Sequence, residues 1–400
     1  MEMPRKEKEI KHVLIIPSWY PDAKAPHNGT FFREQAQMLK RAGLQVEVLA
    51  LQSDSRLLSY SRELEISLEE DTPVLRGFLP REIGWGLPGD AWLAKKAAQP
   101  LLKKYAELYG VPDVIQAHSV FRAIYVAAAA SRLWKIPYVV TEHRTSSLTR
   151  TPWLPRTRSL RKAVQQANGR AAVSTAFAAA LSDFYGAPWQ VLTLPVLDSD
   201  SNTPLPQLGA EEPFVFSHVS YWDERKREKM TLRAFAKMHV RLPNTRMVMA
   251  GGAGKAMEEV TELRRELGLE EVVDLQGVLP RPQVAQLLAH THCFVLASCE
   301  EAAGIVFAEA QMAGLPCIGT RTFGGEYMIS ESAGIRVPID GEDELAEAMY
   351  EMAKDRHQKY NPEAVRTQAR QRFSEATFIA ASEQYYRAAL ADYQQRNFIK

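Results

Sequence analysis

The chain has 400 residues, 46% of them apolar and 24% charged, with a formal net charge of +1. At about 150 residues per domain this length predicts two or three globular domains, and the near-neutral total excludes the overall basic character of a nucleic-acid-binding protein. No apolar run reaches the roughly 18 residues that a membrane-spanning helix needs, and residues 1–11 lack the apolar stretch of a secretory signal.

Strand-like and helix-like segments alternate along the first half of the chain, which is typical of an α/β domain with a parallel sheet. The strands predicted from apolar runs are His12–Ile16, Gln45–Ala50, Val114–Ala117, Tyr138–Thr141, Ala171–Ser174 and Gln190–Leu194. Helices are predicted over Thr30–Arg41, which Gly43 would stop, and over the Ala-rich segment Ile124–Trp134.

A stretch rich in Pro, Ser, Asn and Asp, residues 198–213, predicts a linker, after which the alternation starts again. The second set of predicted strands is Phe214–Val219, Arg246–Ala250, Val272–Leu275, Cys293–Ala297 and Pro316–Gly319. The helices between them are predicted at Thr231–His239, Met257–Leu267, Pro282–His290 and Gly304–Ala313, and only helical patterns follow Pro338, out to Phe398. Two α/β units predict a cleft that binds ligands at the carboxyl ends of strands.

Charge is distributed unevenly over these two halves. Residues 1–200 hold 26 Lys and Arg against 20 Asp and Glu, and residues 91–170 hold 14 basic side chains against three acidic ones, a local net of +11. Such a cluster indicates an anionic partner. Lys95–Lys104 and Trp153–Lys162 combine cations with apolar residues, as segments on an anionic membrane surface do. A merely solubilising surface is the alternative.

The most informative segment of the second half is residues 298–316. A buried strand is expected to end at Ala297, a loop of small residues follows, and a helix is expected to begin near Gly304. Backbone N–H groups of Gly304, Ile305 and Val306 would then be free to bind an anion such as a diphosphate, helped by the helix dipole.

Two glutamates accompany this helix start. Glu309 follows Glu301 by eight residues, which is about two helical turns along the same face. A phosphate at the helix start would therefore leave one carboxylate for a ribose diol and the other for a sugar hydroxyl. The alternative is a solvated acidic loop followed by an ordinary helical glutamate.

Here the sequence resembles glycosyltransferase family 4, whose members have the GT-B fold and carry a Glu-x7-Glu motif. The residues that match this motif are Glu301, Gly304, Glu309, Ala310, Ala313, Gly314 and Pro316. Ala303 stands where relatives usually have an aromatic residue, which leaves the identity of the donor sugar open.

A charged loop upstream resembles the family's Arg-x4-Lys segment. Counting back from Phe235 places the family's lysine at Lys226 and its arginine at Tyr221, which departs from the pattern. Arg225 or Arg227 would then replace the missing charge, and the sequence does not choose between them. Two cations here would neutralise a diphosphate leaving group, whereas the alternative is a solvated charge run beside a helix.

In the first half, residues 17–36 resemble the family's opening segment. Asn28, Gly29 and Thr30 would form the loop at the start of the first helix, close to the donor phosphates and the acceptor, and glycine allows the backbone to come close. A plain strand-to-helix turn is the alternative.

Two histidines follow predicted strands of the same half. His118 ends one strand and His143 follows the next. Relatives place a histidine at the first point, where it contacts the donor sugar or supports the reacting groups. Strand ends favour the cleft, and a satisfied interior histidine is the alternative for His118.

A metal site is not expected. Asp198 and Asp200 match the Asp-x-Asp signature of metal-dependent transferases, but they lie in the predicted linker, and GT-B relatives hold the diphosphate with cations and a helix dipole. No Cys/His spacing resembles a zinc site. Three cysteines in apolar contexts, Cys293, Cys299 and Cys317, indicate buried thiols in a reducing cytoplasm.

The resemblance implies the following organisation and function. An N-terminal Rossmann-like domain, residues 1–200, would bind the acceptor, a second, residues 205–372, would bind the nucleotide sugar, and a last helix, residues 375–397, would pack back onto the first. The enzyme would be a retaining hexosyltransferase that moves a sugar from a UDP- or GDP-sugar to a polysaccharide, lipid-linked or small glycan, with no cofactor. Its catalytic residues would be His118, Lys226 and Glu301.

Two other functions fit the same residues. A nucleotide-sugar epimerase of similar architecture would consume a UDP-sugar without an acceptor. A catalytically silent sugar-nucleotide-binding protein is the third hypothesis, which the departures at Tyr221 and Ala303 leave open.

Overall fold

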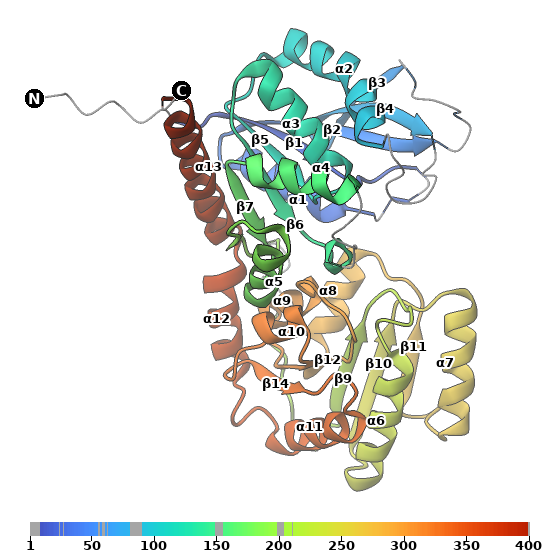
Figure 1. Cartoon of the computed structure of the whole chain (residues 1–400). Coiled ribbons are helices and arrows are strands. Elements are labelled where there is room, and N and C mark those ends of the chain that lie inside the picture. The colour runs from blue at the N-terminus through green and yellow to red at the C-terminus, as the bar shows by residue number, and fades with distance from the viewer. Residues whose placement is uncertain are drawn as a thin grey trace, which may run out of the picture. The chain divides into compact units, whose positions relative to one another are not determined.

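The computed structural model describes residues 9–23, 25–26, 28–54, 57, 61, 63–80, 90–148, 155–197, 204–209 and 211–398. The chain divides into two compact units (Figure 1). Unit 1 runs to Leu192 and takes up the chain again from Phe378, and unit 2 is Thr193–Thr377. Each is an α/β unit built on its own, mostly parallel sheet, as the alternating sequence pattern predicts.

Unit 1 is built on an eight-stranded sheet in the order β3-β4-β2-β1-β5-β6-β7-β8. Its strands are β1 His12–Pro17, β2 Gln45–Asp54, β3 Leu64–Glu69, β4 Thr72–Pro80, β5 Val114–His118, β6 Tyr138–Glu142, β7 Gly169–Ala172 and β8 Gln190–Val191. Neighbouring strands are parallel except for the antiparallel pair β3 and β4. Every residue of β1 is buried, because helices cover both faces of such a sheet.

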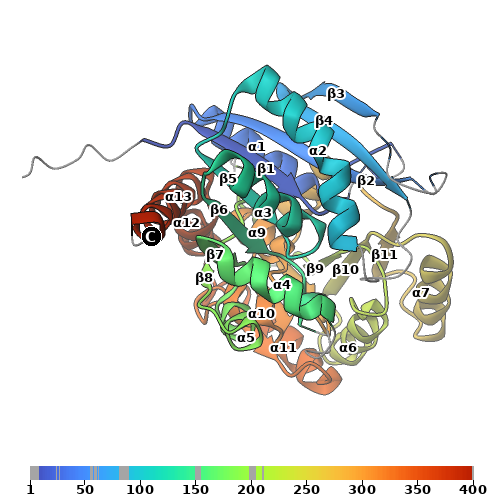
Figure 2. The same cartoon turned by 45° about the horizontal axis from the view of Figure 1, so that its top comes forward.

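The helices of unit 1 are α1 Thr30–Arg41, α2 Asp90–Tyr109, α3 Arg122–Trp134, α4 Pro155–Gln166 and α5 Thr175–Tyr185, with a 3-10 turn at Thr145–Ser147. The predicted bounds of α1 are confirmed, and its buried residues recur at helical spacing. In Figure 2, α2, α3 and α4 follow one another on one side of unit 1, and α3 contacts both of the others. The strand predicted at Ala171–Ser174 ends at Ala172 instead, because Ser174 is already the N-cap of α5.

The last helix, α13 Glu375–Phe398, completes the core of unit 1. The Tyr385 hydroxyl donates to the Val140 carbonyl at 2.8 Å, and the Tyr386 hydroxyl donates to the Gln116 side chain. Both tyrosines are almost fully buried. A Cβ at Gly169 would lie 2.6 Å from the Tyr385 ring, so this strand start must be glycine for the helix to come so close.

Unit 2 is built on a six-stranded, all-parallel sheet in the order β11-β10-β9-β12-β13-β14. The strands are β9 Phe214–Val219, β10 Thr245–Ala250, β11 Val273–Gln276, β12 Cys293–Leu296, β13 Cys317–Thr320 and β14 Gly334–Val337. The helices are α6 Glu228–Arg241, α7 Gly254–Glu266, α8 Arg281–Ala289, α9 Ile305–Met312, α10 Phe323–Met328, α11 Glu342–Asp355 and α12 Pro362–Phe373. Phe216, Phe235 and Met249 are among the buried side chains between the sheet and its helices.

Candidate active site

The start of α9 has the geometry that the Glu-x7-Glu segment predicts. Gly304 is the N-cap of this helix and has a φ of 72°, a conformation that strongly favours glycine. A Cβ there would lie 2.9 Å from the Phe307 ring. The helix begins at Ile305, so the first N–H groups of α9 follow directly on the loop after β12, where an anion could accept hydrogen bonds from them.

Lys226 and Glu301, which are 75 residues apart in sequence, meet beside this helix start. The Lys226 ammonium lies 2.5 Å from Glu301 Oε1, and the Ser298 hydroxyl donates to the same oxygen at 2.8 Å. The Lys226 side chain is 21% exposed and that of Glu301 is 11% exposed. The structure therefore brings together two of the three residues that the sequence predicts to be catalytic, in a partly buried ion pair.

The loop that carries Lys226 is also tied to this segment by its backbone. The Cys299 N–H donates to the Arg225 carbonyl at 2.8 Å. The Arg225 guanidinium pairs with Asp223 at 2.6 Å, which raises the pKa of Arg225, and the nearby charges of Glu300 and Glu301 raise it further. Arg227 is held elsewhere, by Asp340 at 2.6 Å and by the Ile339 carbonyl. Of the two arginines that the sequence left open, Arg225 is thus the one beside the motif.

Glu309 pairs with a basic residue that the sequence did not indicate. Arg281, the first residue of α8, donates from its guanidinium to Glu309 Oε1 at 3.2 Å. The Glu309 side chain is 20% exposed and that of Arg281 is 33% exposed. Each glutamate of the motif therefore has its own basic partner, and the second carboxylate is positioned by α8.

The segment after β13 closes tightly against the first glutamate. The Gly324 N–H donates to the Glu301 carbonyl at 2.9 Å, and a Cβ at Gly324 would lie 2.2 Å from the Ala303 carbonyl oxygen. Ala303 itself is buried. This close contact therefore requires glycine at position 324.

His218, at the carboxyl end of β9, is a further buried group beside Lys226. Its Nε2 lies 2.9 Å from the Ser220 hydroxyl. Burial, with the nearby Lys226 charge, lowers the pKa of His218 to about 3, so its ring is neutral at pH 7. The sequence did not single out His218, because a histidine inside an apolar strand carries no signal of its own.

In unit 1, the two predicted histidines form a pair. His118 ends β5 and His143 follows β6, and His118 Nδ1 lies 3.0 Å from His143 Nε2. Burial lowers the pKa of His118 to about 3, and burial together with His118 lowers the pKa of His143 well below its ordinary value. Both rings are therefore neutral at pH 7 and offer hydrogen bonds rather than positive charge.

The Asn28–Thr30 loop lies next to this pair. Gly29 is the N-cap of α1 with a φ of 85°, and a Cβ there would lie 2.9 Å from the Trp19 ring. Phe32, in the first turn of α1, contacts His118 with ring centroids 4.7 Å apart and His143 at 5.1 Å. The predicted loop and the predicted histidines of unit 1 thus form one cluster.

Glu142 is the organising residue of this cluster that sequence reasoning missed. Its buried carboxylate accepts hydrogen bonds from the Ser119 hydroxyl at 2.5 Å and from the backbone N–H groups of Val120, His143 and Arg144 at 2.7 to 2.9 Å. Burial raises its pKa despite these bonds. A charged residue at the end of an apolar strand, directly before His143, was the available signal.

No group of three or more His, Cys, Asp and Glu side chains in the described part of the chain is placed to hold a metal ion. Asp198, Asp200 and Trp153 lie outside the described residues. Cys293 and Cys317 are buried free thiols, and burial raises the pKa of each. No helix among the described residues is long and apolar enough to cross a membrane.

Comparisons with protein families cover both halves of the chain. Residues 203–376 match the family described as glycosyl transferases group 1, and residues 29–195 match the family described as Glycosyltransferase Family 4. Together these matches include every residue of the candidate site except Asn28.

Among individual relatives, the chain is 28% identical over 272 residues to a D-inositol 3-phosphate glycosyltransferase from Kribbella flavida, which is 62% of this chain and 64% of that protein. It is 31% identical over 145 residues to a putative teichuronic acid biosynthesis glycosyltransferase from Bacillus subtilis, which is 33% of this chain and 36% of that protein. The alignments thus span less than two thirds of these relatives.

Solved structures match over nearly the whole length. A lipopolysaccharide outer core galactosyltransferase in its apo form has a TM-score of 0.71 at 16% identity, covering 94% of this chain and 98% of the other. HepE from Anabaena in complex with UDP-glucose has a TM-score of 0.66 at 19% identity, covering 93% and 98%. At these identities the likeness establishes the fold.

Proposed function

We propose that this chain, which belongs to glycosyltransferase family 4 and has the GT-B fold, is a retaining transferase of EC class 2.4. Its donor would be a nucleotide-diphosphate sugar. UDP- and GDP-sugars are the proposed donors, and a glycan, polysaccharide or lipid-linked sugar is the proposed acceptor. The observation that carries the proposal is the Lys226–Glu301 pair beside the N-terminus of α9. A cation, a carboxylate and the first N–H groups of α9 therefore lie together, and a diphosphate sugar needs all three.

The proposed roles follow from this chemistry. The diphosphate would bind the first N–H groups of α9, with Lys226 and Arg225 supplying positive charge without a metal. Glu309 would accept hydrogen bonds from the ribose hydroxyls, and Glu301 would accept one from the donor sugar. A neutral His118, held by His143, would hydrogen-bond a sugar hydroxyl without adding charge.

The proposed reaction is a same-face displacement. The bond between the anomeric carbon and the diphosphate oxygen breaks, and its electron pair leaves with the diphosphate. The acceptor hydroxyl then attacks from the side that the leaving group has vacated, and its proton passes to a diphosphate oxygen. Charge grows on the diphosphate during this step, so the surrounding cations stabilise the transition state more than the ground state.

A donor screen tests this proposal. We expect UDP- or GDP-sugars to raise the melting temperature of the full chain and to be hydrolysed slowly without an acceptor. With an acceptor glycoside, NMR of the product should show the anomeric configuration of the donor. An inverted product would contradict retention. A new nucleotide sugar formed without acceptor would identify an epimerase, and binding without turnover a silent binding protein.

Reversible attachment to an anionic membrane is proposed for the basic helices of unit 1. Trp92, near the start of α2, is 58% exposed, and Lys103 on the same helix is also exposed. Arg158 and Lys162 are exposed on α4. An exposed tryptophan among cations is typical of a surface that lies at the lipid interface, so the enzyme would be peripheral to the membrane that carries its acceptor.

Co-sedimentation with vesicles tests this attachment. Each cation near an anionic surface contributes about 1 kcal/mol, so the chain should sediment with anionic vesicles at low salt, less at high salt, and not with neutral vesicles. Trp92→Ala should weaken the binding several-fold. Binding that does not depend on lipid charge or salt, or no binding at all, would contradict the proposal and indicate that these helices form a solubilising surface.

A further inference from the structure

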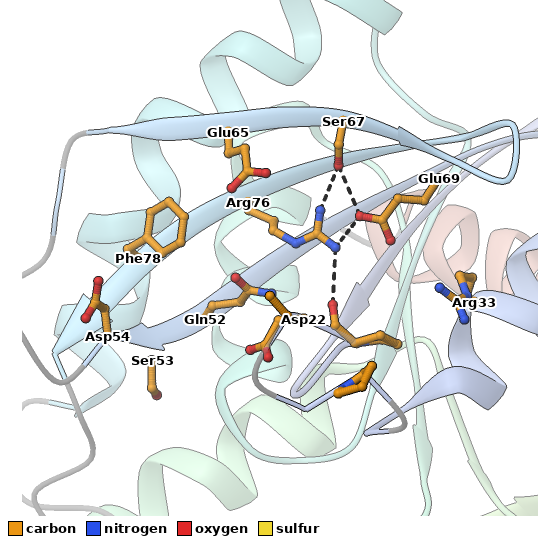
Figure 3. Close-up of a pocket in the computed structure, with 13 residues that line it drawn as sticks. Asp22, Arg33, Gln52, Ser53, Asp54, Glu65, Ser67, Glu69, Arg76 and Phe78 are labelled. Atoms are coloured by element: carbon orange, nitrogen blue, oxygen red, sulfur yellow. Dashed lines mark hydrogen bonds and ion pairs between the residues drawn. The ribbon is translucent and has the colours of Figure 1, made fainter. Parts of the chain in front are cut away.

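Arginines of this chain hold separate segments together by donating to backbone carbonyl groups. Arg76 of β4 is an example in unit 1, where its guanidinium donates to the Pro21 carbonyl at 3.2 Å. Figure 3 shows the same guanidinium beside Ser67 and Glu69 of the neighbouring strand, with which it also interacts. Arg76 thereby joins the β3–β4 hairpin to the loop after β1. In unit 2, an arginine that donates in the same way comes directly after Lys226.

This second arginine, Arg227, has an unusual backbone conformation. It is the N-cap of α6 and has a φ of 51°, in the left-handed region that residues other than glycine rarely adopt. Its carbonyl accepts a hydrogen bond of the first helical turn, from the Thr231 N–H at 3.1 Å. The N–Cα bond of Arg227 therefore lies between Lys226 and the helix, and its rotation sets where Lys226 lies relative to α6.

The Arg227 guanidinium stabilises this conformation from another loop. It donates to the Ile339 carbonyl at 2.7 Å and to the Asp340 carboxylate at 2.6 Å, both between β14 and α11. The Asp340 side chain is 85% exposed and that of Arg227 is 27% exposed, so solvent screens the ion pair more than the bond to the carbonyl. A strained backbone persists where its surroundings over-determine it, and these two bonds have that effect here.

The loop that anchors Arg227 is fixed against α6 by helix α11. The two helices contact each other, as Figure 1 shows within unit 2. Ion pairs between them are Arg233–Glu342 at 2.7 Å, Lys237–Asp343 at 2.6 Å and Arg241–Glu347 at 2.5 Å. Exposed pairs contribute little each, but several in a row fix the register of α11 against α6. The start of α11 therefore stays opposite the start of α6.

On its other side, the same loop holds Lys226 toward the Glu-x7-Glu segment. The Cys299 N–H donates to the Arg225 carbonyl, and the Lys226 ammonium lies 2.5 Å from Glu301. The adjacent side chains of Lys226 and Arg227 thus reach two different loops, one after β12 and the other after β14. A rotation at Arg227 would move Lys226 away from Glu301.

We propose that Arg227 is a positioning residue for Lys226. Its left-handed backbone, held by the loop between β14 and α11, directs Lys226 to the start of α9, and its own charge does not act on the diphosphate. The expected effect on kcat rests on the proposed transferase function, whereas the position of Lys226 is a property of the chain without substrate. A displacement of about 1 Å in an active site can lower a rate about 10²-fold.

Alanine and glycine at position 227 separate the effect of the backbone from that of the guanidinium. Both remove the two hydrogen bonds, but glycine adopts a φ of 51° without strain and alanine does not. Arg227→Ala should lower kcat about tenfold with little change in the donor KM, whereas Arg227→Gly should stay within about threefold of the wild type. Arg227→Lys, which keeps a donor and a cation, should lie between alanine and the wild type.

Two kinetic outcomes would overturn the proposal. Wild-type kcat in Arg227→Ala would show that the position of Lys226 does not depend on this residue. Equal losses in Arg227→Ala and Arg227→Gly would indicate that the guanidinium itself acts on the diphosphate, because the backbone conformation would then not matter.

Acetylation of the full chain by acetic anhydride, with the modified lysines identified by mass spectrometry, tests the position of Lys226 without substrate. In the wild type, Lys226 is 21% exposed and paired with Glu301, so it should react slowly. Arg227→Ala should make Lys226 react several-fold faster, and Arg227→Gly should not. Lys255 on α7 is 86% exposed and serves as a reference whose rate should be the same in every variant. Unchanged acetylation of Lys226 in Arg227→Ala would contradict the proposal.

Arg356 provides the matched control. It is the C-cap of α11, has a φ of 45°, and donates to the Gly209 and Glu212 carbonyls at 2.5 and 3.2 Å. Those carbonyls precede β9, whereas Lys226 follows it. Arg356→Ala should therefore lower the melting temperature as Arg227→Ala does, but leave kcat and the acetylation of Lys226 unchanged. A loss of kcat in Arg356→Ala would show that any loosening of unit 2 is sufficient, and would overturn the positioning role.

The positioning role and the transferase function can fail separately. Hydrolysis of UDP-glucose and GDP-mannose by the wild type is measured in parallel without acceptor. If neither donor is hydrolysed, the transferase proposal is contradicted, and acetylation alone decides whether Arg227 positions Lys226. If a donor is hydrolysed and Lys226 does not respond to Arg227→Ala, the transferase function stands and the role of Arg227 is rejected.

Discussion

Replacing Lys226 with alanine is expected to lower kcat about 10²- to 10³-fold, with a much smaller rise in the donor KM. In the resting protein the Lys226 ammonium is paired with Glu301 at 2.5 Å, so part of its charge is already balanced before the donor binds. In the proposed reaction the diphosphate would gain negative charge during bond cleavage, so the stabilisation by Lys226 should grow at that moment. Steady-state kinetics with the donor varied at saturating acceptor would measure the two effects separately.

Lys229 is the matched control for this experiment. It lies three residues further along, in the first turn of α6, and pairs with Glu259 of α7 rather than with the motif. Lys229→Ala should therefore keep wild-type kcat and KM, and Lys226→Arg should recover part of the activity. If Lys229→Ala loses kcat while Lys226→Ala does not, the assignment of the lysine is wrong.

Replacing Glu309 with alanine is expected to weaken nucleotide binding at least tenfold while the fold survives. A carboxylate that accepts hydrogen bonds from both ribose hydroxyls contributes about 1.5–3 kcal/mol for each bond. Removing a negative charge from a diphosphate site would by itself strengthen binding, so a loss identifies hydrogen bonds rather than net charge. Calorimetry with UDP and GDP would measure the change, and an unaltered dissociation constant would remove Glu309 from the site.

Arg281 distinguishes a direct role of Glu309 from a structural one. Its guanidinium holds Glu309 Oε1 at 3.2 Å, so Arg281→Ala should weaken nucleotide binding less than Glu309→Ala does, by releasing the carboxylate without removing it. Glu309→Gln keeps one acceptor oxygen and should lie between the two. Equal losses in all three variants would indicate that the network as a whole, not the ribose contact, is being measured.

The regular elements that the sequence predicted well are those whose burial is continuous or strongly periodic. Strand Phe214–Val219 and helix Thr30–Arg41 have the predicted bounds, because an apolar run and an amphipathic repeat each leave a direct mark on the sequence. The hairpin β3–β4 was not predicted. The first of its strands is an exposed edge, with Ile66 and Leu68 on the solvent side, so its pattern does not separate a core face from a surface. Helix α2 was obscured by Pro100 in its interior.

The residues of the candidate site also fall into two groups, those that the sequence indicates and those that only the fold brings to the site. Glu301, Gly304 and Glu309 are close in sequence, so their spacing on one helix start could be read directly. Arg281 reaches Glu309 from another helix, and nothing in its local sequence indicates that contact. Identifying Glu142 and His218 as site residues depends on knowing that they are buried. An apolar run predicts that a strand is buried, but it does not show whether one polar residue in that strand is buried as well.

Helix α13 has a consequence for how the chain is made. Unit 1 closes its core with Tyr385 and Tyr386, but Thr193–Thr377 are synthesised between Leu192 and this helix. At about 5–20 residues per second, that interval lasts roughly 10 to 40 s. During this time the β5 and β6 face that α13 will cover is exposed on the nascent chain, whereas unit 2 emerges as one uninterrupted segment. The first unit to be translated is therefore the second that can finish folding, and a ribosome that stalls late would leave that apolar face open to chaperones or to aggregation.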